Sequence, residues 1–137
     1  MRLITLFVFL VLSPTLYAQS WQICNNGKVL LKTETENEEK NKISLDSIHL
    51  SKKGLTLQYN EGKEKKKGWE RVIAVYDSAG KELKQQKGNS LQLSRDSLHY
   101  YLKNSPLLKF FTWSLPTDPK LKALVRVRRI HLATISQ

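Results

Sequence analysis

Short alternating apolar segments separated by turn signals predict an all-β fold with one short helix. Turn signals occur at residues 26–27 (NG), 51–54 (SKKG) and 77–80 (DSAG). Asn-Gly pairs, and turns closed by a left-handed glycine, are typical of hairpins that join antiparallel strands. We therefore predict an antiparallel β-sandwich of about seven strands, immunoglobulin-like or fibronectin-like.

The first half of the chain is predicted to hold two hairpins. The first joins WQIC (21–24) to KVLL (28–31), and the second joins ISLDSIHL (43–50) to LTLQY (55–59). LTLQY alternates strictly between apolar and polar residues, as a strand with one buried face does. Residues 33–42, TETENEEKNK, hold no apolar residue and are predicted to form a solvated loop.

The second half is predicted to supply the central strands and the helix. Residues 72–76 (VIAVY) and 108–115 (LKFFTWSL) are apolar enough to be covered on both faces. KELKQQ (81–86) is polar, and its lysines are typical of an edge strand. Ser94 precedes RDSLHYYLKN (95–104), which is predicted to be a helix with Ser94 as its N-cap.

The N-terminus has the pattern of a secretory signal peptide at residues 1–18. Arg2 precedes an apolar run over residues 3–12, and Ala18 supplies a small residue at the cleavage point. We expect residues 19–137 to form a single β-sandwich domain, without a transmembrane segment. No Asn-X-Ser/Thr sequon occurs, which favours a bacterial periplasmic or secreted protein.

Charge is the strongest deviation in composition. Without Arg2, the 23 basic residues become 22, which against 12 acidic residues gives a mature charge of +10. Residues 19–39 hold two lysines and four glutamates, whereas residues 40–137 hold 20 basic and eight acidic residues. This asymmetry predicts attraction to anionic partners.

The first candidate binding site is ALVRVRRIHLATI, residues 123–135. Val125 and Val127 alternate with arginines, and the alternation shifts by one position at the adjacent arginine pair. A β-bulge there would place one residue more on this strand than on its partner. We predict an outward basic stripe, or simply a solvated strand face, made of Arg126, Arg128, Arg129 and His131.

The second candidate lies in EGKEKKKGWERV, residues 61–72. Lysines beside a tryptophan can combine attraction to an anion with stacking of a planar group. The two glycines that bracket the lysines equally predict a solvated hairpin tip. The candidate residues are Lys63, Lys65, Lys66, Lys67, Trp69 and Arg71.

The sequence holds no catalytic or metal-binding motif. His49, His99 and His131 stand apart, so we predict no metal site, no cofactor and no enzyme activity. The near-identical tetrapeptides DSIH (46–49) and DSLH (96–99) do not extend into a longer repeat, and we interpret them as chance. A hydrolase, the least favoured hypothesis, would need a cavity that gathers a histidine with a carboxylate or serine.

These observations predict a secreted or periplasmic, non-enzymatic binding module with a basic surface. Its expected partner is an anionic glycan, a lipid head group or an acidic protein face, and export argues against nucleic acid. The alternative is an accessory component of an envelope assembly that docks through a sheet edge or an apolar patch. Residues 113–120, WSLPTDPK, predict a crossover or a rigid recognition loop. The single cysteine, Cys24, is expected to be either a buried inert thiol or part of an intermolecular bridge.

Overall fold

The computed structural model of the chain describes residues 19–62 and 67–137. These residues form two β-sheets and two short helices. The signal peptide that we predict at residues 1–18 lies outside the described part. None of the described helices is long and apolar enough to cross a membrane.

The smaller sheet has four strands in the order β2-β1-β4-β7, and each neighbouring pair is antiparallel. It contains the N-terminal hairpin at one edge and two later strands beside it. Its strands are β1 (Ser20–Asn25), β2 (Lys28–Thr33), β4 (Leu55–Asn60) and β7 (Ser90–Leu93).

The larger sheet has five strands in the order β3-β9-β8-β5-β6. The predicted central strands are confirmed as β5 and β8, and the predicted polar edge is confirmed as β6. The prediction that all strands pair antiparallel is wrong, because β3 pairs parallel with β9. The strands are β3 (Lys42–Ser44), β5 (Trp69–Asp77), β6 (Glu82–Lys87), β8 (Leu107–Pro116) and β9 (Ile130–Ser136).

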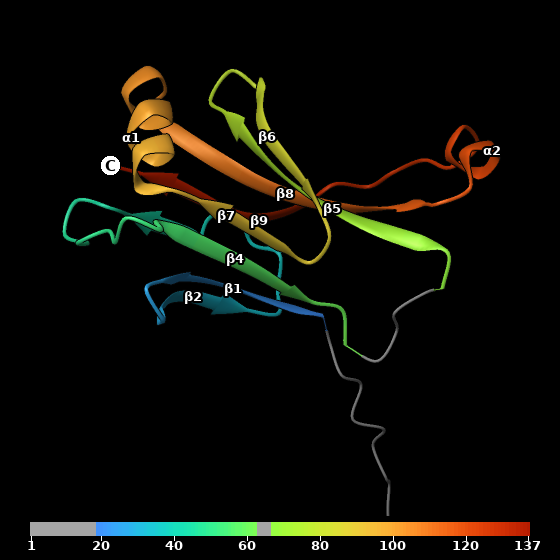
Figure 1. Cartoon of the computed structure of the whole chain (residues 1–137), viewed down its shortest axis with the longest axis horizontal. Coiled ribbons are helices and arrows are strands. Elements are labelled where there is room, and N and C mark those ends of the chain that lie inside the picture. The colour runs from blue at the N-terminus through green and yellow to red at the C-terminus, as the bar shows by residue number, and fades with distance from the viewer. Residues whose placement is uncertain (1–18, 63–66) are drawn as a thin grey trace, which may run out of the picture.

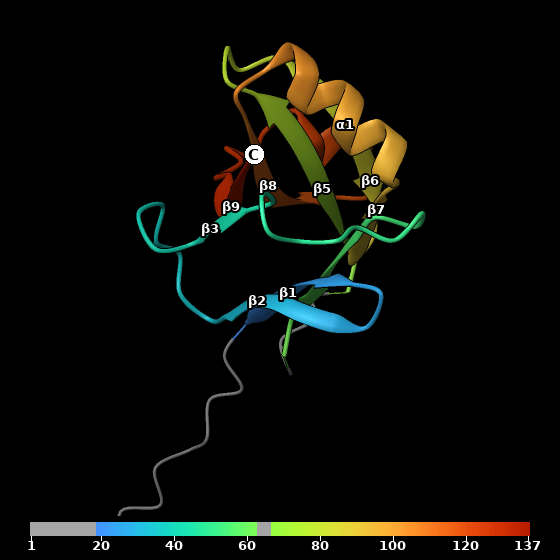
Figure 2. The ribbon, with the colours of Figure 1, turned by 90° about the vertical axis from the view of Figure 1, so that its left-hand side faces the viewer.

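The two sheets stack on each other and enclose the main hydrophobic core (Figures 1 and 2). Ile23 and Leu57 of the smaller sheet belong to the same buried cluster as Phe110 of the larger sheet. Trp21 also links the sheets, since its indole N–H donates to the Leu132 carbonyl at 2.9 Å. The indole N–H thereby has the hydrogen-bond partner that a buried polar group requires.

Two of the three predicted hairpins are confirmed. β1 and β2 are joined by Asn26 (φ 48°) and Gly27 (φ 81°), and this pair of positive φ values is that of a type I′ turn. β5 and β6 are joined by a turn in which the Gly80 N–H donates to the Asp77 carbonyl at 3.1 Å. Local turn chemistry therefore decides both connections.

The predicted hairpin between residues 43–50 and 55–59 is wrong. The turn itself forms, since the Gly54 N–H donates to the Ser51 carbonyl at 2.9 Å. However, β3 ends at Ser44 and belongs to the other sheet. The Asn25 side chain takes the place of a strand ladder, because it donates to the His49 carbonyl (2.8 Å) and accepts from the Ser51 N–H (3.1 Å).

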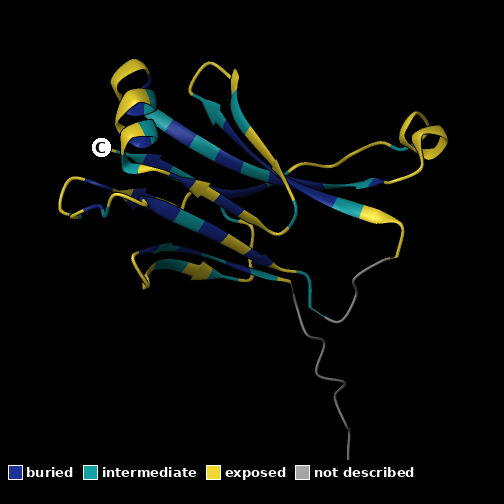
Figure 3. Cartoon of the chain, viewed as in Figure 1, coloured by how far each residue is buried: buried dark blue, intermediate teal, exposed yellow. Residues whose placement is uncertain are grey.

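The predicted helix is confirmed as α1 (Arg95–Asn104). Ser94 is its N-cap, and its hydroxyl accepts from the Ser97 N–H at 3.2 Å. Leu98 and Leu102 are buried in the main core. A second helix, α2 (Pro119–Lys122), has no buried residue and lies at the opposite end of the molecule from α1 (Figures 1 and 3).

Candidate functional site: a basic arm

The two central strands carry part of the chain beyond the smaller sheet. The start of β5 and the end of β8 run past it side by side, and α2 stands at their far end (Figure 1). The Thr117 N–H donates to the Gly68 carbonyl at 2.8 Å and ties the two strands together there. We call residues 67–69 and 117–127 the basic arm.

The tip of the basic arm is a single helical turn. Asp118 caps α2, since its carboxylate accepts from the Lys120 N–H at 2.9 Å, and Pro119 occupies the first helical turn. The turn continues past α2, where the Leu124 N–H donates to the Leu121 carbonyl at 3.0 Å. Two side chains three residues apart on a helical turn lie on the same face, so Leu121 and Leu124 are neighbours.

The basic arm exposes large apolar side chains of the kinds that are mostly buried in the rest of the described chain. Leu124 is 81% exposed and Leu121 is 50% exposed. Of the six large apolar side chains most exposed in the described residues, four belong to the arm. Contiguous exposed apolar patches are typical of interaction surfaces, whereas single exposed apolar residues are normal on any protein surface. The four are Trp69 (36%), Leu121 (50%), Leu124 (81%) and Val127 (37%).

Basic side chains alternate with these apolar ones. Lys67, Lys120, Lys122 and Arg126 are exposed, and no described acidic side chain forms an ion pair with any of them. The arm's only carboxylate, that of Asp118, is engaged in the helix cap. Their charges are therefore available to an anionic partner.

Arg128 and Arg129 form the return segment between the arm and β9. Both contact the body of the protein, by which we mean the two stacked sheets and their loops. The guanidinium of Arg128 donates to the Glu36 carboxylate at 2.9 Å. The guanidinium of Arg129 lies 5.1 Å from the ring centroid of Tyr76 and 5.5 Å from that of Phe111. Cation–π contacts of this kind hold the segment against the outer face of the larger sheet.

The predicted strand with a bulge at Arg128 and Arg129 is therefore wrong. β9 begins only at Ile130, and the extra residue in its ladder is Leu132, between the pairs Phe110–Ala133 and Phe111–His131. The ion pair and the aromatic contacts draw the two arginines out of the ladder. Arg126 belongs to the arm, Arg128 and Arg129 lie on the body, and the four predicted residues form no single stripe.

His131 is buried, and the prediction that it faces solvent is wrong. Its Nε2 lies 2.8 Å from the Thr134 hydroxyl oxygen, and its ring packs edge-on against Phe111. Its Nδ1 has no hydrogen-bond partner among the described residues. Burial lowers its pKa and nearby Lys109 lowers it further, against the opposing effect of Glu36 and Glu38. A neutral buried imidazole of this kind belongs to the core.

The described residues of the second predicted cluster are also separated, because Arg71 is buried whereas Lys67 and Trp69 are exposed. Arg71 is only 8% exposed and forms an ion pair with Glu61 at 2.5 Å, so it is not part of the basic surface. Its guanidinium stacks 4.0 Å from the Tyr59 ring centroid. Trp69 and Arg71 do border one shallow hollow of about 360 Å³ beside the arm. Lys67 is exposed, whereas Lys63, Lys65 and Lys66 lie outside the described residues.

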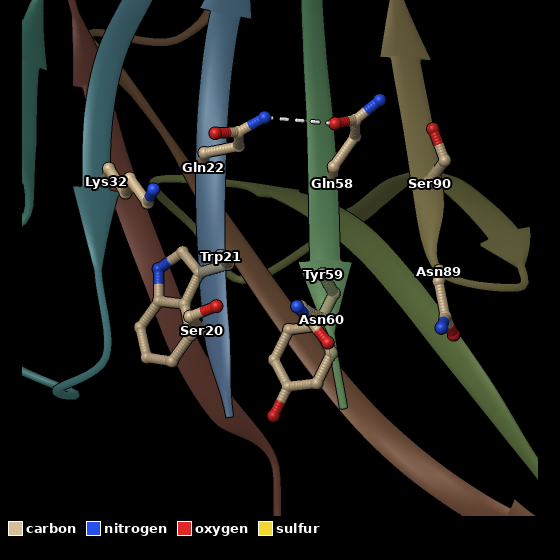
Figure 4. Close-up of a pocket in the computed structure, with 9 residues that line it drawn as sticks. All are labelled: Ser20, Trp21, Gln22, Lys32, Gln58, Tyr59, Asn60, Asn89 and Ser90. Carbon is tan, nitrogen blue, oxygen red and sulfur yellow. Dashed lines mark hydrogen bonds between the residues drawn. The ribbon is translucent and has the colours of Figure 1, made fainter. Parts of the chain in front are cut away.

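A second hollow, of about 520 Å³, lies on the smaller sheet (Figure 4). Side-chain amides and hydroxyls line most of it, and Lys32 is its single charged residue. Gln22 donates to Gln58 across β1 and β4 at 3.0 Å. Because it offers little positive charge, this hollow is a poorer anion site than the arm.

A third hollow, of about 660 Å³, brings together the two similar tetrapeptides that we interpret as chance. Asp46 and His49 of the first line it beside Asp96 and His99 of the second. No hydrogen bond or ion pair joins a histidine to a carboxylate here among the described residues. No described group of three or more metal-ligating side chains is arranged to hold a metal ion. The hollow gathers two histidines with two carboxylates, as the hydrolase hypothesis requires, but they are not in hydrogen-bond contact with one another.

The tip of the arm was not predicted from the sequence. Lys120 is the last residue of WSLPTDPK, which we expected to be a crossover or a recognition loop, and Leu121, Lys122 and Leu124 follow it. Alternating basic and apolar residues after two prolines were the available signal. Comparison with protein-family models, curated proteins and solved structures finds no match for the chain.

Proposed function

We propose that the protein is an exported, non-enzymatic binding module that binds an anionic surface through its basic arm. The observation that carries this proposal is the exposure of Lys120, Lys122 and Arg126 on a projecting part of the fold, where none of them has an acidic partner among the described residues. A secreted or periplasmic location and a bacterial source are part of the proposal, as is an immunoglobulin-like or fibronectin-like connectivity, which the two stacked sheets support.

The distribution of charge supports this function. The chain carries a net charge of +11, and between Thr117 and Arg129 it holds five basic residues and one acidic residue. Exposed charges of one sign raise the local concentration of oppositely charged partners and speed their encounter. Phosphate, sulfate or carboxylate groups on a lipid, a glycan or a protein would all be attracted.

The alternative function is docking into a larger envelope assembly. The four exposed apolar side chains of the arm favour it, because an apolar patch can bind another protein without charge complementarity. The two functions differ in their salt dependence. Binding to an anionic surface weakens steeply as salt rises, whereas apolar docking does not.

Salt-gradient elution from immobilised dextran sulfate tests the proposal. The arm variant is Lys120→Ala/Lys122→Ala/Arg126→Ala, and the control is Lys28→Ala/Lys52→Ala/Lys103→Ala. The control residues are equally basic and exposed, but they lie outside the arm. Both variants lose the same charge, so their comparison removes the effect of net charge.

We expect the arm variant to elute at clearly lower salt than the control variant. Three lost contacts should reduce the slope of log affinity against log salt by roughly 2 to 3, the value for counterion release. Equal elution of the two variants would show that binding follows overall charge and would refute the arm as the site.

A further inference from the structure

We infer that the anionic surface bound by the basic arm is that of a phospholipid bilayer, and that Leu121 and Leu124 enter its head-group region. This inference rests on the proposed function and names its partner. It adds a claim about the apolar side chains, which attraction to a soluble polyanion does not require.

The apolar side chains carry the argument. Leu124 and Leu121 have no place in the core, since α2 has no buried residue and Leu124 is 81% exposed. A sulfated or phosphorylated polymer would contact the lysines and leave these leucines in water. A bilayer offers apolar surface directly beneath its charged head groups, so both kinds of side chain find a partner.

The order of residues fits a surface that is charged outside and apolar beneath. Leu121 stands between Lys120 and Lys122, and Leu124 lies on the same face of the turn as Leu121. Lysine and arginine stems can lie along apolar surface while their charges stay at the head groups. Basic residues beside apolar ones are therefore typical of segments that lie in the membrane interface.

The position of the arm makes such contact sterically simple. α2 stands at the end of the molecule, away from both the smaller sheet and α1 (Figure 1), and its residues are exposed (Figure 3). Insertion of an interfacial segment reaches roughly 5–10 Å into the head-group boundary. Trp69, 36% exposed at the base of the arm, has an amphipathic ring of the kind enriched at membrane interfaces.

Co-sedimentation with vesicles tests this inference. The probes are vesicles of phosphatidylcholine alone and vesicles of phosphatidylcholine with phosphatidylglycerol. The decisive variant is Leu121→Ser/Leu124→Ser, which keeps every charge of the arm. Val29→Ser is its control, because Val29 is 48% exposed but lies on β2. Since neither leucine is buried, an unchanged unfolding midpoint is expected for the decisive variant.

We expect the unaltered protein to sediment with the anionic vesicles and to stay in the supernatant when only neutral vesicles are present. The Leu121→Ser/Leu124→Ser variant should bind anionic vesicles roughly tenfold more weakly or worse. Its elution from dextran sulfate should stay unchanged. The arm variant that lacks Lys120, Lys122 and Arg126 should bind both anionic vesicles and dextran sulfate more weakly. On vesicles, the loss should be roughly fivefold for each charge removed.

The outcomes separate this inference from the function on which it rests. Vesicle binding that is equal in the leucine variant and the Val29→Ser control would refute the bilayer inference and leave the arm as an anion site. Binding of dextran sulfate without binding of anionic vesicles would also refute it and identify a soluble polyanion as the partner. The proposed function itself would fail if the Lys120→Ala/Lys122→Ala/Arg126→Ala variant bound vesicles and dextran sulfate as well as the Lys28→Ala/Lys52→Ala/Lys103→Ala control did.

Discussion

Arg128 forms an ion pair with Glu36, with 2.9 Å between the guanidinium nitrogen and the carboxylate oxygen, although 92 positions separate them in sequence. The other carboxylate oxygen of Glu36 accepts from the backbone N–H of His131 at 3.3 Å. One acidic side chain of the loop between β2 and β3 thus fastens both the return segment of the arm and the start of β9.

Removal of this carboxylate should loosen the return segment. In Glu36→Gln, we expect faster amide hydrogen exchange over residues 125–131, because both contacts to Glu36 weaken. Arg128 is 79% exposed in its side chain, so the free energy of unfolding should change by about 1 kcal/mol or less. Glu34→Gln, which makes the same change of charge, is the control. Equal exchange in the two variants would contradict the fastening role.

Acid should destabilise the fold through His131. Its folded-state pKa is lowered, chiefly by burial, below the unfolded value of 6.5. Below that pH the unfolded chain binds a proton that the folded chain rejects, so stability rises with pH in this window. The contribution of His131 is complete above pH 6.5 and is lost as pH falls below it.

Urea unfolding at pH 7.5 and pH 5.5 checks this prediction, with His131→Asn as the comparison. We expect the original protein to lose more stability between the two pH values than the variant does. His99→Asn, which removes an exposed histidine, should behave like the original protein. A pH dependence that is unchanged in His131→Asn would show that other groups are responsible.

The buried ion pair at the base of the arm should be costly to break. Glu61→Gln leaves the charge of Arg71 unpaired. Because the side chains of Arg71 and Glu61 are only 7% and 13% exposed, water cannot compensate for the lost partner. We expect a loss of about 3 kcal/mol in the free energy of unfolding, measured by urea titration. The double variant Glu61→Gln/Arg71→Met should be more stable than Glu61→Gln alone, since it removes the orphaned charge. A loss no larger than that of an exposed pair would contradict this account.

Features fixed by neighbouring residues could be predicted from the sequence. The turn at Asn26 and Gly27, the cap at Ser94 and the polar edge strand β6 each depend on a few adjacent side chains. The apolar runs of β5 and β8 likewise identify them as central strands. These elements were predicted correctly because local chemistry and the final packing agree.

Features fixed by distant residues could not be predicted in this way. β3 is three residues long and pairs parallel with the last strand, which its own sequence does not reveal. The alternation around Arg128 and Arg129 predicts a strand, but contacts to Glu36 and Tyr76 override it. The bulge consequently occurs at Leu132, and His131 turns inward.

A lysine footprint on the unaltered protein tests directly whether the basic arm is the anion-binding site. Exposed lysines are acetylated with a limiting amount of reagent, with and without dextran sulfate, and the sites are quantified by mass spectrometry. We expect strong protection of Lys67, Lys120 and Lys122, with little change at Lys28, Lys52 and Lys103. Equal protection of both sets, or protection confined to lysines outside the arm, would contradict it.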